Sequence, residues 1–199
     1  MTAPAPSSTS LAPGFLVAAP ALADPNFAGS LVLMVQHSPE GALGFVANRP
    51  GPIGVGDVLK EVDDRLWRAG LAWGRTGEPV LLGGPVRPER LWILCGAAAS
   101  RAEDDPIAVG DSLAVGGSRE LLEAVIRDPE RGRFQLILGC AGWGPLQVEN
   151  EVSRGAWIPL PLHQDLLFDV PLASRWDEAV RRLGLEPGGF TVGGGGAQA

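Results

Sequence analysis

Lysine, histidine and cysteine are scarce in this 199-residue sequence, and each shortage narrows the chemistry that the chain can perform. The single lysine, Lys60, does not follow a run of glycines, so the chain lacks the phosphate-binding loop that many nucleotide-hydrolysing proteins use. The two cysteines, Cys95 and Cys140, are too few for a disulfide framework in a chain of this length. The two histidines, His37 and His163, offer few imidazole bases and no cluster of metal ligands. We therefore expect no metal ion and no other cofactor.

Basic stripes and long apolar runs are also missing. The chain has 16 basic and 23 acidic residues, a formal net charge of −7, and residues 101–199 hold 9 basic against 15 acidic side chains. A domain that binds DNA directly usually presents a basic surface to the phosphates, so direct nucleic-acid binding is not expected. The longest clean apolar run, residues 31–35, is far too short to span a bilayer, and no lysine or arginine precedes Arg49 to begin a secretory signal. These absences predict a cytoplasmic protein without membrane contact.

The composition that remains is that of a globular domain. Hydrophobic residues make up 45% of the chain and charged residues 20%, which is typical of a protein with a packed core. Residues 1–12 are small, polar and rich in proline, and residues 191–199 are mostly glycine, so both ends are expected to be flexible tails. No linker or internal repeat is found between them. Residues 13–190 are therefore predicted to form one domain.

Short apolar runs, mostly in the first half of the chain, indicate β-strands. The segment between the second and third runs, residues 37–41, contains Pro39 and Gly41 and is expected to form a hairpin turn. Because the runs are almost continuously apolar, both faces of the sheet must be covered, and helices are the expected cover. The predicted strands lie in residues 14–18, 30–36, 42–47, 79–82, 90–95 and 133–138.

Helical spacing is found in the second half of the chain. Ser118 can cap a helix whose apolar side chains fall on one face. A weaker pattern predicts a helix over Pro145–Ser153, and Ser174, three residues before Asp177, has the spacing of a capping box for a helix that ends at Gly184. We therefore predict an α+β fold. It is a single compact domain whose β-rich N-terminal half forms a mostly antiparallel or mixed sheet, covered by helices from the C-terminal half.

Three local motifs suggest chemistry, and each has a structural alternative. Residues 110–114 approximate the GxSxG motif of serine hydrolases, but no helix pattern follows directly, so we predict a turn. Residues 139–144 join a predicted strand to a predicted helix, where backbone amides can bind an anion; tight strand–helix packing around Trp143 is favoured, because two glutamates follow. Cys95 and Cys140 each follow a predicted strand. They either meet as a redox pair, if the strands are neighbours, or are buried inert thiols.

Three blocks of sequence occur in an order that is typical of a known family. The blocks are GFLVAAP (14–20) with DPNF (24–27), SLVL (30–33), His37, GALG (41–44) and NRP (48–50); LGGPV (82–86); and GCAGWGP (139–145) with Gln147, Glu149, Glu151 and Trp157. Over about residues 13–186 this set resembles the AlgH/YqgE family of small bacterial proteins. The resemblance implies a compact α+β domain, cytosolic in bacteria and without an established biochemical activity. Such proteins are often labelled transcriptional regulators because of a link to alginate production. Two positions depart from the family pattern: Cys140 stands where an aromatic residue is usual, and Leu146 where a glycine is common.

The polar side chains of these blocks fall in predicted turns and form a candidate site. If the loops converge, they make a polar surface that binds a protein or a small-molecule partner. In the alternative interpretation, Asn26 and Asn48 satisfy the backbones of their turns, and Arg49 pairs with Asp24 or Glu149. The candidate residues are Asp24, Asn26, His37, Asn48, Arg49, Gly83, Gly84, Trp143, Gln147 and Glu149.

No complete set of catalytic groups is recognised, so we predict a non-enzymatic regulatory or adaptor protein that affects transcription through partners. The first alternative is an enzyme of unfamiliar type, with His37 and either Asp24 or Glu149 as acid–base groups. The second alternative is a small-ligand-binding domain. The shape of the site should separate an enzyme from a binding protein: a concave pocket that holds His37 beside a carboxylate favours an enzyme, and a flat or convex polar patch favours binding.

Overall fold

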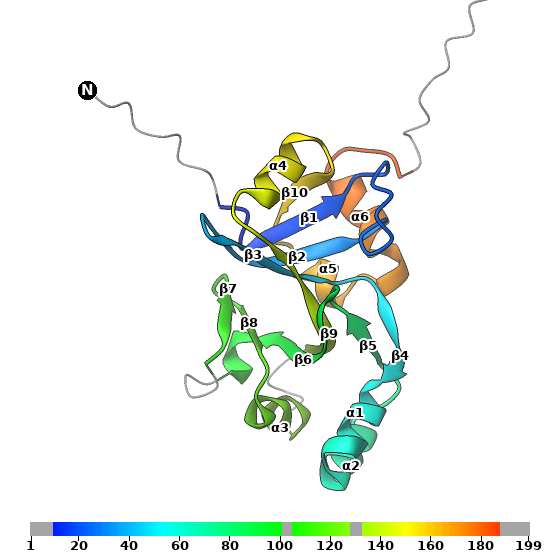
Figure 1. Ribbon diagram of the computed structural model, residues 1–199. Coiled ribbons are helices and arrows are strands. Elements are labelled where there is room, and N and C mark those ends of the chain that lie inside the picture. Colours follow the sequence, from blue (N-terminus) through cyan, green and yellow to red (C-terminus); the bar gives the residue numbers. More distant parts are fainter. Residues whose placement is uncertain (1–9, 101–104, 128–132, 188–199) are drawn as a thin grey trace, which may run out of the picture.

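A computed structural model describes residues 10–100, 105–127 and 133–187 of the chain (Figure 1). The predicted C-terminal tail, and residues 1–9 of the predicted N-terminal tail, lie outside these residues. Within them, strands form one mostly antiparallel sheet and helices pack against it, which confirms the predicted α+β fold.

Ten strands of the described chain form the sheet. They are β1 (Gly14–Ala18), β2 (Leu31–Ser38), β3 (Gly41–Val46), β4 (Pro50–Gly54), β5 (Pro79–Leu82), β6 (Val86–Gly96), β7 (Ile107–Val109), β8 (Leu113–Gly116), β9 (Phe134–Trp143) and β10 (Trp157–Pro161). The order of the strands in the sheet is β10-β1-β2-β3-β9-β6-β8-β7. Off this path, β5 pairs with β4 in antiparallel orientation and with β9 in parallel orientation, the one parallel pairing among the described residues. All the predicted runs are strands, and the hairpin turn expected within residues 37–41 is formed by Pro39 and Glu40 between β2 and β3. The sequence did not indicate β4, β7, β8 or β10.

Strand β9 joins the two halves of the sheet. It pairs with β6 along its N-terminal part and with β3 near its C-terminal end. At Gly139 the backbone has φ +69°, and a Cβ there would lie 2.5 Å from the carbonyl oxygen of Gly84. Residues 139–143 belong to the strand, so most of the segment 139–144 is not the predicted connection to the helix at Gln147–Ser153. The predicted packing of Trp143 against that helix is confirmed, because its indole N–H bonds to Glu151. A close approach of two backbones, rather than packing against a helix, requires the glycine.

The helices that cover the sheet come from both halves of the chain. They are α1 (Val55–Val62), α2 (Asp64–Ala72), α3 (Arg119–Arg127), α4 (Gln147–Ser153), α5 (Asp165–Phe168) and α6 (Arg175–Arg182), with 3-10 turns at Ala97–Ala99 and Leu172–Ser174. Ser118 caps α3 as predicted, since its hydroxyl accepts the Leu121 N–H at 3.0 Å. The predicted capping box before α6 is wrong: Ser174 is itself helical, with φ −102° and ψ −6°, and its side chain does not bond to the helix. The sequence did not indicate α1 and α2. Asp63 lies between these two helices, and its side chain caps the N-terminus of α2 by accepting the Arg65 N–H.

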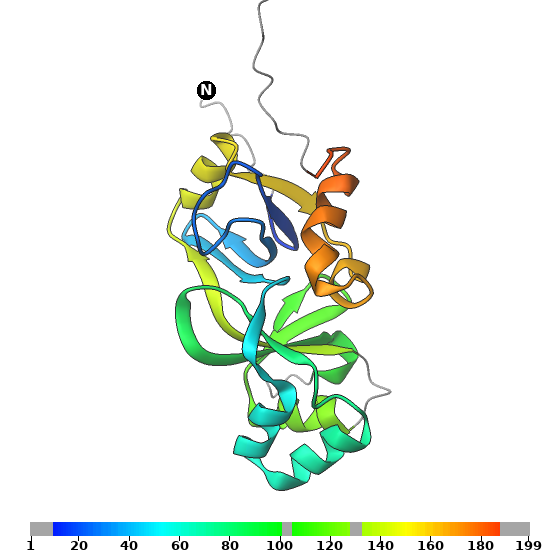
Figure 2. The same cartoon turned by 90° about the vertical axis from the view of Figure 1, so that its right-hand side faces the viewer.

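Three hydrophobic cores are formed by the described residues. Figure 2 shows α4 at one end of the molecule, α5 and α6 along its side, and α1, α2 and α3 at the opposite end. In β1, Phe15 belongs to a central core between the two halves of the sheet, which α5 and α6 close, and Leu16 belongs to an outer core under α4. In β6, Leu94 lies in the central core and Ile93 in a second outer core under α1, α2 and α3. Alternate residues of a strand point to opposite faces, so both faces of these strands are buried. This explains their continuously apolar sequences.

The two cysteines are buried in different cores. Strands β6 and β9 are neighbours, but their antiparallel register pairs Cys95 with Phe134 and places Cys140 opposite Val86. Cys95 lies in the outer core under α3, and Cys140 lies in the central core. Burial raises the pKa of the Cys140 thiol, which makes it a poorer nucleophile at neutral pH. The alternative in which the two thiols meet is therefore wrong.

Other segments that suggested special chemistry form ordinary structure. Residues 110–112 make the turn between β7 and β8, so the match to GxSxG is a turn, as predicted. In the part of the chain that the structure describes, no group of three or more His, Cys, Asp or Glu side chains is arranged to hold a metal ion. None of the described helices has the length and apolar character needed to cross a bilayer.

Candidate functional site

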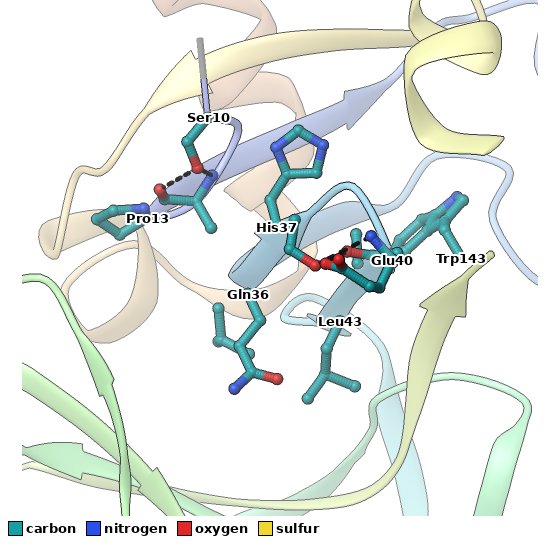
Figure 3. Close-up of a pocket in the computed structure, with 12 residues that line it drawn as sticks. Ser10, Pro13, Gln36, His37, Glu40, Leu43 and Trp143 are labelled. Atoms are coloured by element: carbon teal, nitrogen blue, oxygen red, sulfur yellow. Dashed lines mark hydrogen bonds between the residues drawn. The ribbon is translucent and has the colours of Figure 1, made fainter. Parts of the chain in front are cut away.

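His37 reaches its position because β2 carries a β-bulge. Met34 and Gln36 pair with consecutive residues of β3, so Val35 is an extra residue in the ladder. The insertion reverses the alternation of side chains along the strand. As a result, the ring of His37 lies on one side of the hairpin and the side chains of Gln36 and Leu43 lie on the other (Figure 3). The bulge therefore turns His37 toward the face that α4 covers.

Both ring nitrogens of His37 bond to other parts of the protein. Nδ1 accepts the backbone N–H of Leu11 at 3.0 Å, and Nε2 lies 3.0 Å from Oε1 of Glu149 on α4. Because a backbone amide can only donate, Nδ1 carries the lone pair and Nε2 carries the proton that Glu149 accepts. The His37 side chain is 5% exposed. The imidazole thus ties the N-terminal segment and α4 to the β2–β3 hairpin.

A second carboxylate of α4, Glu151, holds two tryptophans. Its Oε2 accepts the indole N–H of Trp143 at 2.9 Å and that of Trp157 at 2.8 Å. Its Oε1 accepts a hydrogen from Gln147 at 2.9 Å, and Gln147 accepts the Gly144 N–H at 3.1 Å. The candidate residues Trp143 and Gln147 therefore both bond to Glu151, which is not among the predicted candidate residues. The i, i+4 spacing of Gln147 and Glu151 on one helix face is the signal that could have identified it.

Asn48 fastens the turn of residues 24–29 to the start of β2. Its Oδ1 accepts the Leu31 N–H at 2.9 Å, and its Nδ2 donates to the carbonyl oxygen of Gly29 at 2.9 Å. These bonds confirm the alternative interpretation of Asn48, in which its side chain satisfies the backbone of a turn.

Arg49 binds the same turn through backbone oxygens. Its Nη1 donates to the carbonyl oxygen of Asn26 at 2.7 Å, with longer contacts to neighbouring carbonyls. The carboxylate of Asp24 accepts the Asn26 N–H at 2.7 Å. The pairing of Arg49 with Asp24 or Glu149, which the alternative interpretation gives, is wrong, because the guanidinium donates to backbone carbonyl groups.

Gly83 and Gly84 hold the connection between β5 and β6 in place through their backbones. The Gly83 N–H donates to the carbonyl oxygen of Leu138 at 2.7 Å, and its own oxygen accepts the Val46 N–H at 2.9 Å. Gly84 has φ +143°, and a Cβ there would lie 2.5 Å from the carbonyl carbon of Cys140. The two glycines therefore allow the β5–β6 connection to pass directly against β9.

The structure sorts the polar candidate residues into two groups of contacts. The hairpin group consists of His37, Trp143, Gln147 and Glu149. The turn group consists of Asp24, Asn26, Asn48 and Arg49. Asn48 bonds to Leu31, at the opposite end of β2 from His37, about 20 Å away along an extended strand. The stacked rings of Phe27 and Trp143, 6.2 Å apart, connect the two groups. Their role in binding a partner stays a prediction.

A pocket of about 680 Å³ lies beside the β2–β3 hairpin (Figure 3). His37, Glu40 and Leu43 are among its lining residues. A hydrogen bond from the Ser38 hydroxyl holds the pKa of Glu40 below its usual range, so this carboxylate is ionised at neutral pH. By shape alone, a pocket that contains an imidazole and a carboxylate favours the enzyme alternative. The hydrogen bonds of His37, however, leave neither ring nitrogen available to a bound substrate.

Comparison with known proteins identifies close relatives of this chain. The sequence model of the AlgH-like family matches residues 15–188. A UPF0301 protein of Anaeromyxobacter dehalogenans strain 2CP-C is 61% identical over 196 residues, which are 98% of this chain and 100% of the relative. A UPF0301 protein of Stenotrophomonas maltophilia strain K279a is 40% identical and covers 89% of this chain and 92% of its own.

Two solved structures share the architecture. The solution structure of the AlgH protein from Pseudomonas aeruginosa has a TM-score of 0.72 and 30% identity, and the match covers 94% of both chains. The crystal structure of DIP2367 from Corynebacterium diphtheriae has a TM-score of 0.67 and 21% identity over 88% of both chains, a likeness of fold alone. The match of the family model to nearly the whole folded region, with relatives this similar, confirms the resemblance: the chain belongs to the AlgH-like family.

Proposed function

We propose that this protein is a non-enzymatic regulatory or adaptor protein that affects transcription through partners and does not bind DNA itself. The observation that carries the proposal is that both ring nitrogens of His37 are used in hydrogen bonds within the fold. Its ring nitrogens bond to the backbone of Leu11 and to Glu149, so the imidazole cannot exchange a proton with a substrate unless contacts of the fold are broken. Asn48 and Arg49 are likewise used to hold a turn.

A partner is expected to contact the surface that the fold leaves exposed. Leu82 is 36% exposed and Val86 is 42% exposed, on either side of the Gly83–Pro85 connection. A pocket of about 180 Å³ is lined by Leu82, Pro85, Asn26 and Arg49, among others, and Val86 follows Pro85 in the chain. Exposed apolar side chains beside a hollow are typical of protein-binding surfaces. We call this surface the Leu82–Val86 groove, and we expect it to receive an apolar side chain of a protein partner.

Affinity capture from a cell lysate tests this surface. The variant Leu82→Glu/Val86→Glu places charges in the groove, and Leu71→Glu/Trp73→Glu is the matched control, because those side chains are 53% and 54% exposed near the end of α2. We expect the groove variant to lose a captured protein that the wild type and the control retain. Identical captures by all three proteins would contradict the groove as the partner surface. Substitution of Asn48 or Arg49 would be less informative, since it would release the turn that they hold.

The competing functions predict different measurements. An enzyme predicts turnover of a metabolite by the purified protein, which disappears in His37→Gln. Direct DNA recognition predicts an affinity for duplex DNA that falls steeply as the salt concentration rises. Either result would overturn the proposed function.

A further inference from the structure

Arg175, the first residue of α6, is a buried cation without a counter-ion. The residue is 4% exposed. Its Nε donates to the carbonyl oxygen of Val170 at 3.1 Å, Nη1 donates to the carbonyl oxygen of Ala47 and to Oε1 of Gln135, and Nη2 donates to the carbonyl oxygen of Leu167. All four acceptors are electrically neutral. No carboxylate in the described ranges forms an ion pair with this guanidinium.

The surroundings of Arg175 do not balance its charge. Burial lowers its pKa to about 10, so the guanidinium is still charged at neutral pH. A charge that is removed from water without a partner of opposite sign is strongly unfavourable. The positive end of the α6 dipole lies at the same place and adds to the cost. A guanidinium also has five N–H donors, and four acceptors are found within the described chain, so one hydrogen of Nη2 has none there.

A pocket of about 430 Å³ adjoins Arg175, and we call it the Arg175 pocket. This volume lies in the range of small-molecule sites in proteins. Two other arginines line the pocket, but both are paired: Nε of Arg75 lies 2.6 Å from Oε1 of Glu78, and Arg133 bonds to Asp169. The uncompensated charge offered to a ligand is therefore the single positive charge of Arg175. Much of the remaining wall is apolar, formed by Val55, Pro79, Leu81, Phe168, Val170 and Leu172.

We propose that the Arg175 pocket binds a small amphiphilic monoanion, a carboxylate with a short apolar tail. The carboxylate accepts the remaining Nη2 hydrogen of Arg175 and neutralises the buried charge. The tail packs against Phe168 and Leu172 and removes their apolar surface from water. One negative charge matches the site, whereas a neutral ligand of the same shape would leave Arg175 unpaired. The pocket shares no lining residue with the Leu82–Val86 groove, so this proposal does not depend on the proposed function.

Calorimetric titration of the full chain with octanoate and with octanamide, its neutral analogue, tests the role of charge. We expect octanoate to bind at one site and at least about tenfold more tightly than octanamide. Equal affinities for the two compounds would show that the pocket does not recognise the charge. If octanoate does not bind at concentrations up to about 10 mM, its binding free energy is smaller in magnitude than about 3 kcal/mol. Arg175 would then serve only to hold parts of the fold together. Either result would overturn the proposal.

A variant that blocks the pocket tests the location of the ligand. Arg175→Gln is poorly suited, because it also removes bonds that hold α6 to the rest of the protein. Leu172→Trp fills the pocket at a half-buried position and leaves Arg175 in place. We expect it to weaken octanoate binding at least about tenfold without a change in the thermal unfolding midpoint. Leu71→Trp, at a 53% exposed position of α2, is the control and should bind as the wild type does. Wild-type affinity in Leu172→Trp would place octanoate elsewhere and contradict the proposal.

Discussion

Glu151 is the residue whose removal tests the structural account of the hairpin group most directly. Its carboxylate accepts the indole N–H groups of Trp143 and Trp157 at 2.9 Å and 2.8 Å. Trp143 is 7% exposed and Trp157 is 3% exposed, so water can replace Glu151 as the acceptor only poorly. In Glu151→Ala, two buried donors therefore lose their partner.

The expected loss of stability follows from these two bonds. A hydrogen bond to a charged group contributes about 1.5 kcal/mol or more, and a buried donor left without a partner costs about 1–3 kcal/mol. We expect Glu151→Ala to lower the free energy of unfolding by about 3–5 kcal/mol, a large part of the roughly 5–15 kcal/mol that stabilises a typical domain. Glu151→Gln keeps an acceptor oxygen but loses the charge. Its expected cost is about 1–2 kcal/mol.

Urea unfolding followed by tryptophan fluorescence measures these differences. Asn150→Ala, at an exposed position of the same helix, is the control and should change the free energy of unfolding by less than about 0.5 kcal/mol. A double-mutant cycle with Trp143→Phe, which lacks the N–H, should give a coupling energy with Glu151→Ala of about 1–2 kcal/mol. A loss below about 1 kcal/mol in Glu151→Ala would show that the two indole bonds contribute little to stability and would contradict the expected role of Glu151.

Strained backbone and a titrating carboxylate also have measurable effects on the stability of the fold. Gly84→Ala should lower the free energy of unfolding by about 3 kcal/mol or more, since the added Cβ would lie 2.5 Å from the Cys140 carbonyl carbon. Gly29 has φ +63° and open space around it, so Gly29→Ala should lower the free energy of unfolding by only about 1 kcal/mol. Equal shifts of the urea midpoint in the two variants would contradict the close approach at Gly84. Leu146 has φ +58° and is 61% exposed, so Leu146→Gly should raise the free energy of unfolding by up to about 1 kcal/mol, and a loss would show that the leucine side chain packs. Hydrogen bonding from Arg182 holds the pKa of Asp165 below its usual range. The stabilisation that the Asp165–Arg182 bond gives is therefore present above about pH 4 and is lost as the pH falls through the lowered pKa of Asp165. The melting temperature should then fall more steeply with decreasing pH in the wild type than in Asp165→Asn. Parallel curves for the two proteins would contradict this linkage.

The strands that the sequence predicts are those whose side chains are buried on both faces. Residues 14–18 and 31–35 are continuously apolar because alternate positions enter the central core and an outer core. β10 carries Pro159 and Pro161, a composition that is untypical of strands, and it lies at the edge of the sheet, where proline is tolerated. β7 and β8 are only three and four residues long, too short for a periodic pattern to be recognised.

The arrangement of the candidate site could not be predicted, because it depends on contacts between distant parts of the chain. His37 bonds to residues 26 positions before it and 112 positions after it, and no local pattern connects Leu11 to Glu149. The bulge at Val35 also leaves no mark in the sequence, although it decides on which face His37 lies. Regular alternation would have pointed His37 into the central core with Val35. Asn48 was different: its place after a strand indicated a turn, and a turn is what it holds.

The residues that make the family recognisable are largely those that hold its backbone in place. Gly83 and Gly84 allow two segments to pass in contact, Asn48 fastens a turn, and Glu151 joins a helix to two indoles. A resemblance carried by such residues identifies a fold, but it says little about what the fold binds, because their polar atoms are already occupied. Binding chemistry has to come from groups that the folded chain leaves incomplete. Arg175 is such a group, since its charge and one of its N–H donors have no match within the described chain, and no motif of the sequence pointed to it.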